Sequence, residues 1–442
     1  MDQLTASESP ANPISTPSIY ALRLRHLQAL GMVCGFAAGA WLGAAEAPTK
    51  LVTVGISPVV VSLLMVAGVF LARWSLPALI RGTGQIKWDV RQAPHLVVWG
   101  VLAGCLWSVA NTLTIFAIRD VGLSIAFPLW NLNSLVGIFW GITLFNELRN
   151  AGTRRWLSVL GGALLMFVGA ALLAFASSTQ APPEHAMRGI LAALAAGLLW
   201  GTMYVPYRKA YLTGMNPLSF VALFTIGELV SMTVLALSYT GGAKALLGEL
   251  AKAQNVMFWL LLGGFIWVVG DLFQQYATKY VGISRGIPLS NTNQLWGLGW
   301  GILVFGELRG RGPSLYAEAI GGSLLIAAGA GAIALSSVTD EEHDRWHEAA
   351  HRERRRYRVP ADYLQAGLAG RESNGTASET SSRSWLDWSI VVVATVIFMV
   401  LAAVSRVPDI VLSWPAIAVL SIVLLIFLVA CGSALWRGTR FS

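Results

Sequence analysis

Long apolar stretches separated by short polar loops run through most of the 442-residue chain. A helix needs about 20 apolar residues to cross the hydrocarbon core of a bilayer. On this criterion the pattern predicts an all-α integral membrane protein. Its spans are expected at residues 27–45, 55–73, 96–118, 121–145, 156–176, 189–207, 218–239, 257–277, 283–305 and 314–336, and, after a polar stretch, at 388–405 and 411–436.

Basic residues are distributed unevenly between the two sides of these spans. With the N-terminus inside, most of the 31 Lys and Arg residues fall on the cytoplasmic side, even when the long loop at 338–387 is discounted. Cytoplasmic loops of membrane proteins carry such an excess. We therefore expect both termini to be cytoplasmic. Residues 1–22 are rich in Ser, Thr and Pro and are expected to be disordered.

Composition agrees with a protein dissolved in lipid. Hydrophobic residues make up 55% of the chain and charged residues 12%, against about 25% charged in soluble domains. The net charge of +8 lies mainly in loops and one basic segment, which favours an anionic membrane surface over nucleic acid. His343, His347 and His351 share one helical face, but a solvated basic helix explains that segment better than a metal site.

Two chemistries lack the residues they need. The sequence contains no Gly-rich phosphate loop, so an ATP-driven pump is not expected. None of the 6 His residues lies at the centre of a predicted span. We therefore expect neither an enzyme nor a resident metal or cofactor.

An internal repeat is the most informative feature of the sequence. The segment at 104–149 recurs without a gap at 264–309, an offset of 160 residues. Each larger copy holds five predicted spans, an odd number, so the second copy must be inverted in the membrane. Inverted repeats that meet near the bilayer midplane are the architecture of secondary transporters. The matched positions include Trp107 with Trp267, Asn131 with Asn291, Asn133 with Asn293, and Glu147 with Glu307.

Two predicted helices carry a polar face at equivalent positions. Residues spaced by about four positions share one side of a helix. Isolated polar residues in a membrane often join helices, at about 0.6 kcal/mol per hydrogen bond, but aromatic and amide groups on both halves favour a binding site. These faces hold Trp267, Asp271, Gln274 and Gln275 in the eighth span, and Trp107, Asn111 and Thr114 in the third.

The fourth and ninth predicted spans add further amides. An uncharged, hydroxyl-rich solute needs groups that donate and accept hydrogen bonds in fixed directions, and an aromatic face for its C–H surface. We expect both spans to contribute to such a site, together with Trp107, Trp267 and Trp296. The additional amides are those of Asn131, Asn133, Asn291, Asn293 and Gln294.

Asp271 is the first candidate for a proton-coupling residue. Burial of a carboxylate within a helical bundle raises its affinity for a proton. A permanent ion pair with Arg285 is an equally good interpretation, since it would compensate both charges. Glu228 is a weaker second candidate, because position 68 of the first half is Gly.

Three smaller patterns bear on the arrangement of the helices. Pro128 and Pro288 are expected to interrupt their helices near the polar clusters, either to open a cavity or only to kink the helix. In the segment YVPYRK at 204–209, the basic pair is expected to mark the cytoplasmic interface and the tyrosines an aromatic belt. Small residues every fourth position favour close helix packing, within the bundle in our interpretation, or at a homodimer interface. They are Gly31, Gly35, Gly39 and Gly43, with Gly297 and Gly301.

The repeat resembles the drug/metabolite transporter superfamily, with its ten spans, short third–fourth and eighth–ninth hairpins and GELR ending. Within it, residues 264–309 are similar to the bacterial glucose/ribose porter group, and the YVPYRK segment is similar to a motif of L-rhamnose–proton symporters. The resemblance covers residues 27–337. It implies a bacterial plasma-membrane sugar carrier with substrate contacts from Trp107, Asn111, Asn131, Trp267, Asp271, Gln275, Asn291 and Gln294.

The sequence therefore predicts a proton-coupled importer of a neutral polyol-like solute, in first place a monosaccharide. An exporter of amino acids or other small metabolites is the alternative on the same fold, and a non-transporting membrane receptor or scaffold is the alternative of another class. The expected organisation is a first five-helix repeat (23–180), an inverted second repeat (181–337), a basic cytoplasmic loop and linker (338–387) and a C-terminal transmembrane hairpin (388–442).

Overall fold

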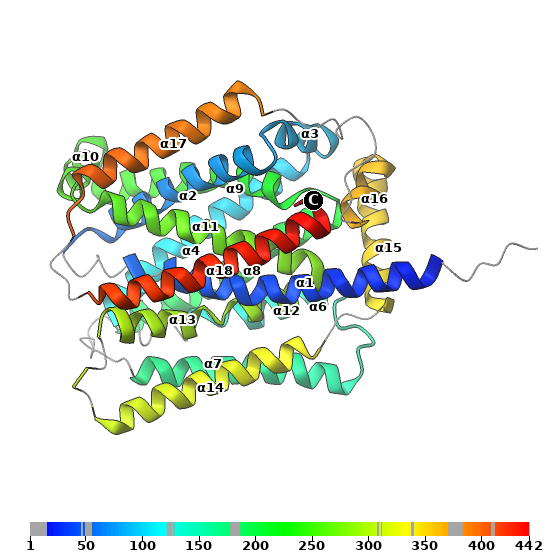
Figure 1. Ribbon diagram of the computed structural model, residues 1–442, viewed down its shortest axis with the longest axis horizontal. Helices are drawn as coiled ribbons and strands as arrows, with labels where there is room; N and C mark the ends of the chain where they lie inside the picture. Colours follow the sequence, from blue (N-terminus) through cyan, green and yellow to red (C-terminus); the bar gives the residue numbers. More distant parts are fainter. Residues whose placement is uncertain are drawn as a thin grey trace, which may run out of the picture.

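The computed structural model describes residues 16–45, 47–48, 55–121, 126, 129–176, 186–306, 309–310, 312–336, 340–369, 383–407 and 412–441. Within these ranges the chain is helical and contains no strand. Ten of the helices found there are long and apolar enough to cross a membrane (Figure 1). They are α1 (Thr16–Ala45), α2 (Pro58–Ile80), α4 (Leu96–Val121), α7 (Thr153–Ala176), α8 (Ala186–Leu212), α9 (Pro217–Thr240), α11 (Met257–Val281), α14 (Pro313–Ala334), α17 (Trp385–Val404) and α18 (Trp414–Thr439).

The predicted fourth and ninth spans are not single long helices. The ninth is divided into α12 (Ile283–Ser290), α13 (Asn293–Gly299) and a π-helical turn, η3 (Trp300–Val304). In the fourth, α6 (Asn133–Phe145) follows a turn at Asn131 and Leu132. Pro288 lies inside α12, so the break comes three residues after it, and Pro128 lies outside the described residues. The polar positions therefore lie at the breaks themselves.

Helix packing follows the inverted repeat. α1 packs along α11, and its equivalent α8 packs along α4. In the same way α2 packs on α11, while α9 packs on α4. The equivalent helices α7 and α14 pack against each other. Each of these contacts is thus matched by the contact that a two-fold axis between the repeats would generate, as an inverted-repeat transporter requires.

Glycines at equivalent positions make the closest helix crossings. A Cβ atom on Gly68 of α2 would lie 2.0 Å from the carbonyl oxygen of Leu261, and one on Gly227 of α9 would lie 2.0 Å from that of Val101. Small residues allow backbones in a membrane to approach this closely, so these crossings fix α2 to α11 and α9 to α4. They also pair Gly68 with Gly227, which makes Val69, and not Gly68, the counterpart of Glu228.

The glycine stripe of α1 packs inside the protein, as expected from the sequence. Its members face α11, α12 and α13, and a side chain larger than hydrogen would collide with them. By contrast, a Cβ atom on Gly297 would meet open space, so close packing does not explain that position. The nearest neighbours along the stripe are Tyr280 at Gly31, Leu289 at Gly35, Thr292 at Gly39 and Trp296 at Gly43.

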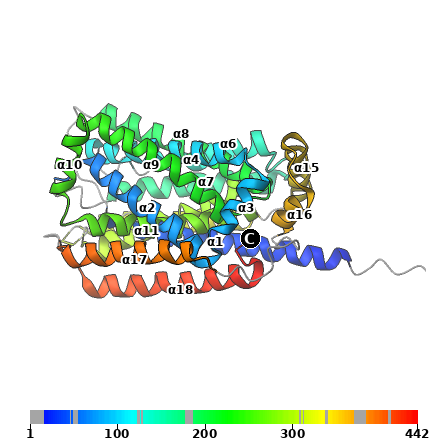
Figure 2. The same ribbon diagram turned by 90° about the horizontal axis from the view of Figure 1, so that it is seen from above.

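Shorter helices and the C-terminal pair surround this core. The equivalent helices α3 (Gly84–Gln92) and α10 (Ala243–Lys252) lie at opposite ends of the bundle (Figure 1). α15 (Asp340–Tyr357) and α16 (Ala361–Ala369) lie across the end that carries α3. α17 packs on α2 and α18 on α1, along one side of the bundle (Figure 2). The core therefore has one capped end, and we refer to α15 and α16 together as the cap.

Two further predictions concern the start of α1 and the position of Trp296, both at the edge of the bundle. Helix α1 begins at Thr16, inside the segment expected to be disordered, while residues 1–15 lie outside the described residues. Trp296 of α13, expected near the binding site, meets Phe427 of α18 edge to face, with ring centroids 5.7 Å apart. The C-terminal pair thus contacts the broken helix of the second repeat.

Candidate functional site

A cavity of about 50 Å³ lies where the two repeats meet. Three pairs of repeat-related residues line it, so it lies on the axis that relates the halves. Its volume holds a few water molecules and is smaller than a hexose. The lining residues are Leu42, Trp107, Trp130, Asn131, Asn133, Trp200, Met203, Tyr204, Trp267, Gln274, Asn291 and Asn293.

Most of the residues predicted for the binding site line this cavity, but three amides lie elsewhere. Asn111 turns away and donates to Ser62 Oγ at 2.7 Å. Gln275 faces the neighbouring charged cluster, where its Nε2 atom donates to Asp271 at 2.5 Å. Gln294 is buried, outside the lining of the cavity. In this conformation, therefore, these three side chains are not placed to contact a solute in the cavity.

Four tryptophans give the cavity aromatic walls. Trp107 and Trp267, which the repeat relates, meet edge to face with ring centroids 4.9 Å apart. Trp130 and Trp200 form a second edge-to-face pair at 6.0 Å. The sequence interpretation missed this second pair. Trp200 carried a signal, because it corresponds to Trp41 in the first repeat at an offset of 159 residues.

Amides from the two repeats are joined across the cavity. Asn291 Nδ2 donates to Asn133 Oδ1 at 2.9 Å and to Ser134 Oγ at 2.5 Å. Gln274 is also engaged, since its Oε1 accepts from Tyr204 and its Nε2 donates to Ser290 Oγ. The helix breaks after α12 and before α6 bring these groups together. The polar set thus links the halves as well as lining the cavity.

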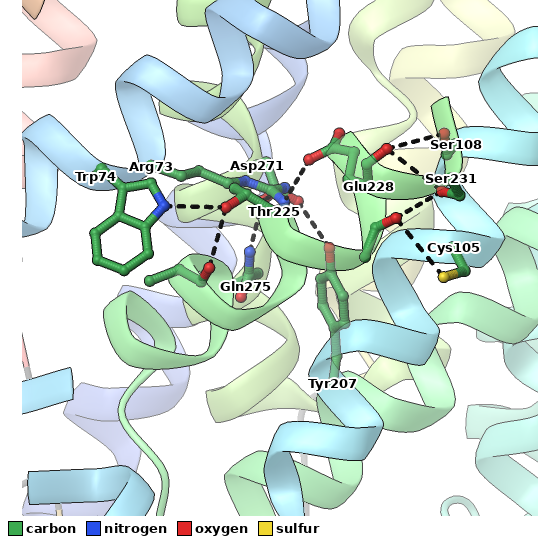
Figure 3. Close-up of polar contacts among 12 residues, drawn as sticks. Arg73, Trp74, Cys105, Ser108, Tyr207, Thr225, Glu228, Ser231, Asp271 and Gln275 are labelled. Carbon is green, nitrogen blue, oxygen red and sulfur yellow. Dashed lines mark hydrogen bonds and ion pairs between the residues drawn. The ribbon is translucent and has the colours of Figure 1, made fainter. Parts of the chain in front are cut away.

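A charged cluster, Arg73, Glu228 and Asp271, lies against Trp267 of the cavity wall. Figure 3 shows the polar contacts of these three charged residues. Arg73 Nη2 is 2.6 Å from Asp271 Oδ2, and Arg73 Nη1 is 3.4 Å from Glu228 Oε2. All three side chains have no exposed surface. Tyr207 donates to Asp271 Oδ1 at 3.4 Å. Charges buried this deeply persist only when they are paired.

Aromatic rings support the guanidinium of Arg73. Its Cζ atom lies 4.1 Å from the ring centroid of Phe224 and 5.1 Å from that of Trp267. Cations are attracted to the faces of aromatic rings at such distances. Because Trp267 also lines the cavity, a single aromatic side chain separates the charged cluster from the space where a solute would bind.

The cationic partner of Asp271 was predicted incorrectly. Asp271 is paired with Arg73, whereas Arg285 donates to the carbonyl oxygens of Ser336 and Val281. The predicted second span ended at residue 73, which placed Arg73 at the membrane surface. In the structure α2 continues to Ile80, so Arg73 lies well inside the helix. The apolar residues that follow it were the signal that could have extended the span.

The tyrosines of the YVPYRK segment are buried, contrary to the expected aromatic belt, whereas its basic pair, Arg208 and Lys209, lies against the cap. Tyr204 lines the cavity, and Tyr207 contacts the charged cluster. The helix continues through this segment, since α8 ends at Leu212. Arg208 is 1% exposed and lies 3.2 Å from Glu147 Oε1. The tyrosines therefore belong to the site and not to an aromatic belt.

Glu147 connects the first repeat to the broken helix of the second. Its carboxylate accepts hydrogen bonds from the backbone N–H groups of Ile283 and Ser284, in the first turn of α12. A negative charge stabilises the N-terminal end of a helix. Arg208 pairs with the same carboxylate, and its Cζ atom lies 3.9 Å from the ring centroid of Trp346 in the cap. A continuous set of contacts thus links the cap to α12.

Comparison with known proteins identifies the family. A family model described as sugar transport protein matches residues 51–176 and 191–354. The chain belongs to this sugar transport family. The match ends within α15, so the C-terminal pair α17 and α18 lies outside it.

Curated relatives of this transporter are bacterial. A putative sugar uptake protein of Listeria innocua is 25% identical over 232 residues, which cover 52% of this chain and 75% of the relative. A putative sugar uptake protein of Streptococcus pyogenes is 25% identical over 227 residues, covering 50% and 74%. The glucose uptake protein GlcU of Staphylococcus xylosus is 22% identical over 227 residues, covering 51% and 73%. The names of these three relatives agree with the sugar transport family.

Proposed function

We propose that this membrane protein imports a monosaccharide by proton-coupled alternating access. The observation that carries the proposal is the cavity between the repeats, which combines tryptophan faces with asparagine and glutamine side chains. Aromatic faces stack on the C–H surface of a sugar, while amides both donate to and accept from its hydroxyl groups. Among the described residues, none that lines the cavity is charged. This chemistry fits a neutral solute better than an amino acid.

The charge balance of the buried cluster supports proton coupling. Arg73 supplies one positive charge, whereas Glu228 and Asp271 would supply two negative charges if both were ionised. An uncompensated charge without access to water is strongly unfavourable. The cluster is neutral when it holds one proton, shared between two carboxylates as a coupled pair. Movement of the repeats that exposes one carboxylate would load or release that proton.

The small volume of the cavity supports alternating access. A hexose does not fit the present space, so binding requires the walls formed by the two repeats to separate. In inverted-repeat transporters such movements open the site to one side of the membrane at a time. We place both chain termini and the cap in the cytoplasm. On that orientation the Glu147–Arg208–Trp346 contacts close the cytoplasmic side.

Uptake by proteoliposomes tests this function. Radiolabelled D-glucose, D-ribose and L-rhamnose would be supplied with and without an inward proton gradient. We expect uptake of at least one of these sugars, accelerated by the gradient and abolished by a protonophore. Absence of sugar uptake, together with gradient-driven movement of labelled amino acids, would overturn the proposal in favour of an amino-acid carrier.

A further inference from the structure

Among the described residues, the cavity asparagines of the two repeats form one hydrogen bond with each other, where the symmetry of the repeat would allow two. Asn291 Nδ2 donates to Asn133 Oδ1 at 2.9 Å. The repeat-related bond would run from Asn131 to Asn293 Oδ1, but within the described part of the chain Asn293 Oδ1 has no hydrogen-bond partner. This oxygen atom is buried, and Asn293 lines the cavity. Its carbonyl group therefore lacks the cross-repeat donor that the carbonyl group of Asn133 has.

Two indole N–H groups share this condition. Trp107 and Trp200 line the cavity, and their Nε1 atoms are buried without an acceptor among the described residues. A buried polar group without a partner costs free energy that a ligand can recover. Trp41, the repeat equivalent of Trp200, also has an Nε1 atom without an acceptor in the part of the chain that the structure describes, but it does not line the cavity. It provides a matched control.

We propose that Asn293 and the indole groups of Trp107 and Trp200 bind the substrate in this state, while Asn133 and Asn291 hold the repeats together. When the transporter reverses, the pair Asn131 and Asn293 takes over the contact between the repeats, and the pair Asn133 and Asn291 is released to the substrate. The inference rests on the proposed function, since it assigns residues within the same cavity. It predicts a solute that offers two acceptors and one donor to these groups, as neighbouring hydroxyls of a neutral sugar do.

The exchange follows from the symmetry of the fold. When two inverted repeats surround one site, the opposite-facing state arises if each repeat takes the arrangement of the other. The bond from Asn291 to Asn133 would then open, and the bond from Asn131 to Asn293 would form. Asn133 Oδ1 would then lose its donor from the other repeat and keep only the 3.5 Å contact from Ser134 Oγ. The substrate thus meets, in each state, one asparagine carbonyl that has no donor from the other repeat.

Transport kinetics test the recognition set. With D-glucose in proteoliposomes, Trp107→Phe, Trp200→Phe and Asn293→Leu each remove one proposed hydrogen bond, which should raise KM about tenfold. Trp41→Phe should leave KM unchanged. Asn291→Leu should lower the maximal rate more than it changes KM, because it breaks the contact between the repeats. Equal effects of Trp41→Phe and Trp200→Phe would overturn the assignment.

The exchange has a test that does not require a substrate. In a background with Cys34, Cys105 and Cys431 replaced by Ser, two double variants would be oxidised in membranes: Asn133→Cys with Asn291→Cys, and Asn131→Cys with Asn293→Cys. Because a disulfide forms only at short Cα separations, each pair reports whether its two positions come together during the cycle. We expect both pairs to cross-link, and each cross-link to block the reversal. Cross-linking of the first pair alone would overturn the exchange.

The results separate this inference from the proposed function. If the wild-type protein transports none of the three sugars, the proposed function fails, and with it the recognition set. If the wild-type protein transports D-glucose while the Trp107, Trp200 and Asn293 variants keep its KM, only the recognition set fails. Monodeoxy derivatives of D-glucose provide a further control. Removal of the sugar hydroxyl that Trp200 binds should weaken binding to the wild type, but it should weaken binding to the Trp200→Phe variant less, because that variant has already lost this hydrogen bond.

Discussion

The charged cluster and its repeat-related counterpart are held by equivalent helices in equivalent positions, but their side chains differ in charge. Around both, glycine crossings hold the helices in matching positions, as Gly68 on Leu261 and Gly227 on Val101 illustrate. Yet the residues that correspond to the charged cluster are neutral. The equivalents of Arg73, Glu228 and Asp271 are Met232, Val69 and Asn111.

The neutral counterpart is a cluster of its own. Asn111 donates to Ser62 Oγ at 2.7 Å, and Ser62 donates to Met232 Sδ at 3.2 Å. Two of the three positions that carry charge on one side are thus linked through Ser62 on the other. The scaffold keeps its symmetry, which permits mirrored movements, while the charges are confined to one side. We infer that coupling to an ion can be separated from movement of the repeats. Mutations that make the charged cluster resemble its neutral counterpart test this inference.

Replacement of Arg73 by Met, the residue at the equivalent position 232, should have the largest effect. It leaves Asp271 and Glu228 buried without a cation. Removal of one partner of a buried ion pair costs about 3–5 kcal/mol. We expect the Arg73→Met variant to lose most of its folded yield in membranes and to show a much lower Tm in detergent.

A second variant sharpens this result. The combination of Arg73→Met, Glu228→Val and Asp271→Asn reproduces the neutral cluster on the charged side. It should recover folding, because no unpaired charge remains, but it should not couple uptake to protons. Met232→Leu is the control and should behave like the wild type. A stable Arg73→Met single variant would contradict the charge balance that we infer.

Replacement of Asp271 by Asn tests coupling alone. The equivalent residue in the first half is Asn111, so the variant makes one position of the two clusters alike. Arg73 and Glu228 remain and balance each other without a proton. We expect a loss of about tenfold in gradient-driven uptake, the size of effect that 1.4 kcal/mol produces, while exchange of labelled for unlabelled sugar persists. Asn111→Ala should keep its response to the gradient.

The repeat made much of this arrangement predictable from the sequence. It indicated the inverted five-helix units, the polar positions at Asn131 and Asn291, and Trp107 and Trp267 as related residues. Arg73 could not be found in this way, because it has no charged equivalent and a charge at the end of an apolar stretch normally lies at the membrane surface. The apolar residues after Arg73 could have extended the predicted span, but only the packing of α9 and α11 around α2 shows what its charge meets.

Tyr204 and Tyr207 were missed for a related reason. Tyrosine beside a basic pair is typical of the membrane interface, and the residues carry no sign of their depth. Burial of Arg208 depends on Glu147, which lies in the other repeat and was treated as a repeat motif without a partner. Periodicity within one helix predicts which residues share a face, whereas contacts between distant helices decide which of those faces is buried.

The contacts of Glu147 differ from those of the charged cluster, since they close one end of the site. Glu147→Gln would retain an oxygen for the N–H groups of α12 but leave the Arg208 charge without its anion. We expect destabilisation of about 2 kcal/mol, below the range for complete loss of a buried partner, measured as a lower Tm. Arg149→Gln, close to it in the chain and exposed, is the control and should change Tm little.

The two ends of the bundle provide the smallest contrast. At the capped end Asp89 of α3 is 1% exposed, and Tyr363 of α16 donates to its Oδ1 at 3.0 Å. At the other end the equivalent position in α10 is Gly248, where an added Cβ atom would meet open space. Burial raises the pKa of Asp89 to about 6, although hydrogen bonds from Gln85 and Tyr363 and the charge of Arg81 oppose the shift.

The raised pKa fixes the sign of a pH effect at the capped end. Folded Asp89 holds its proton up to about pH 6, whereas an unfolded aspartate loses it near pH 3.9. The folded state therefore binds more protons in this interval, and stability falls as the pH rises from about 4 through 6. Between about pH 4.5 and pH 7 the wild type should lose about 2–4 °C of Tm more than the Asp89→Asn variant, whose amide does not titrate.

Gly248→Ala, at the equivalent position of the open end, is the control and should keep the pH dependence of the wild type. If Asp89→Asn also kept it, Asp89 would have to be ionised beneath the cap throughout this range.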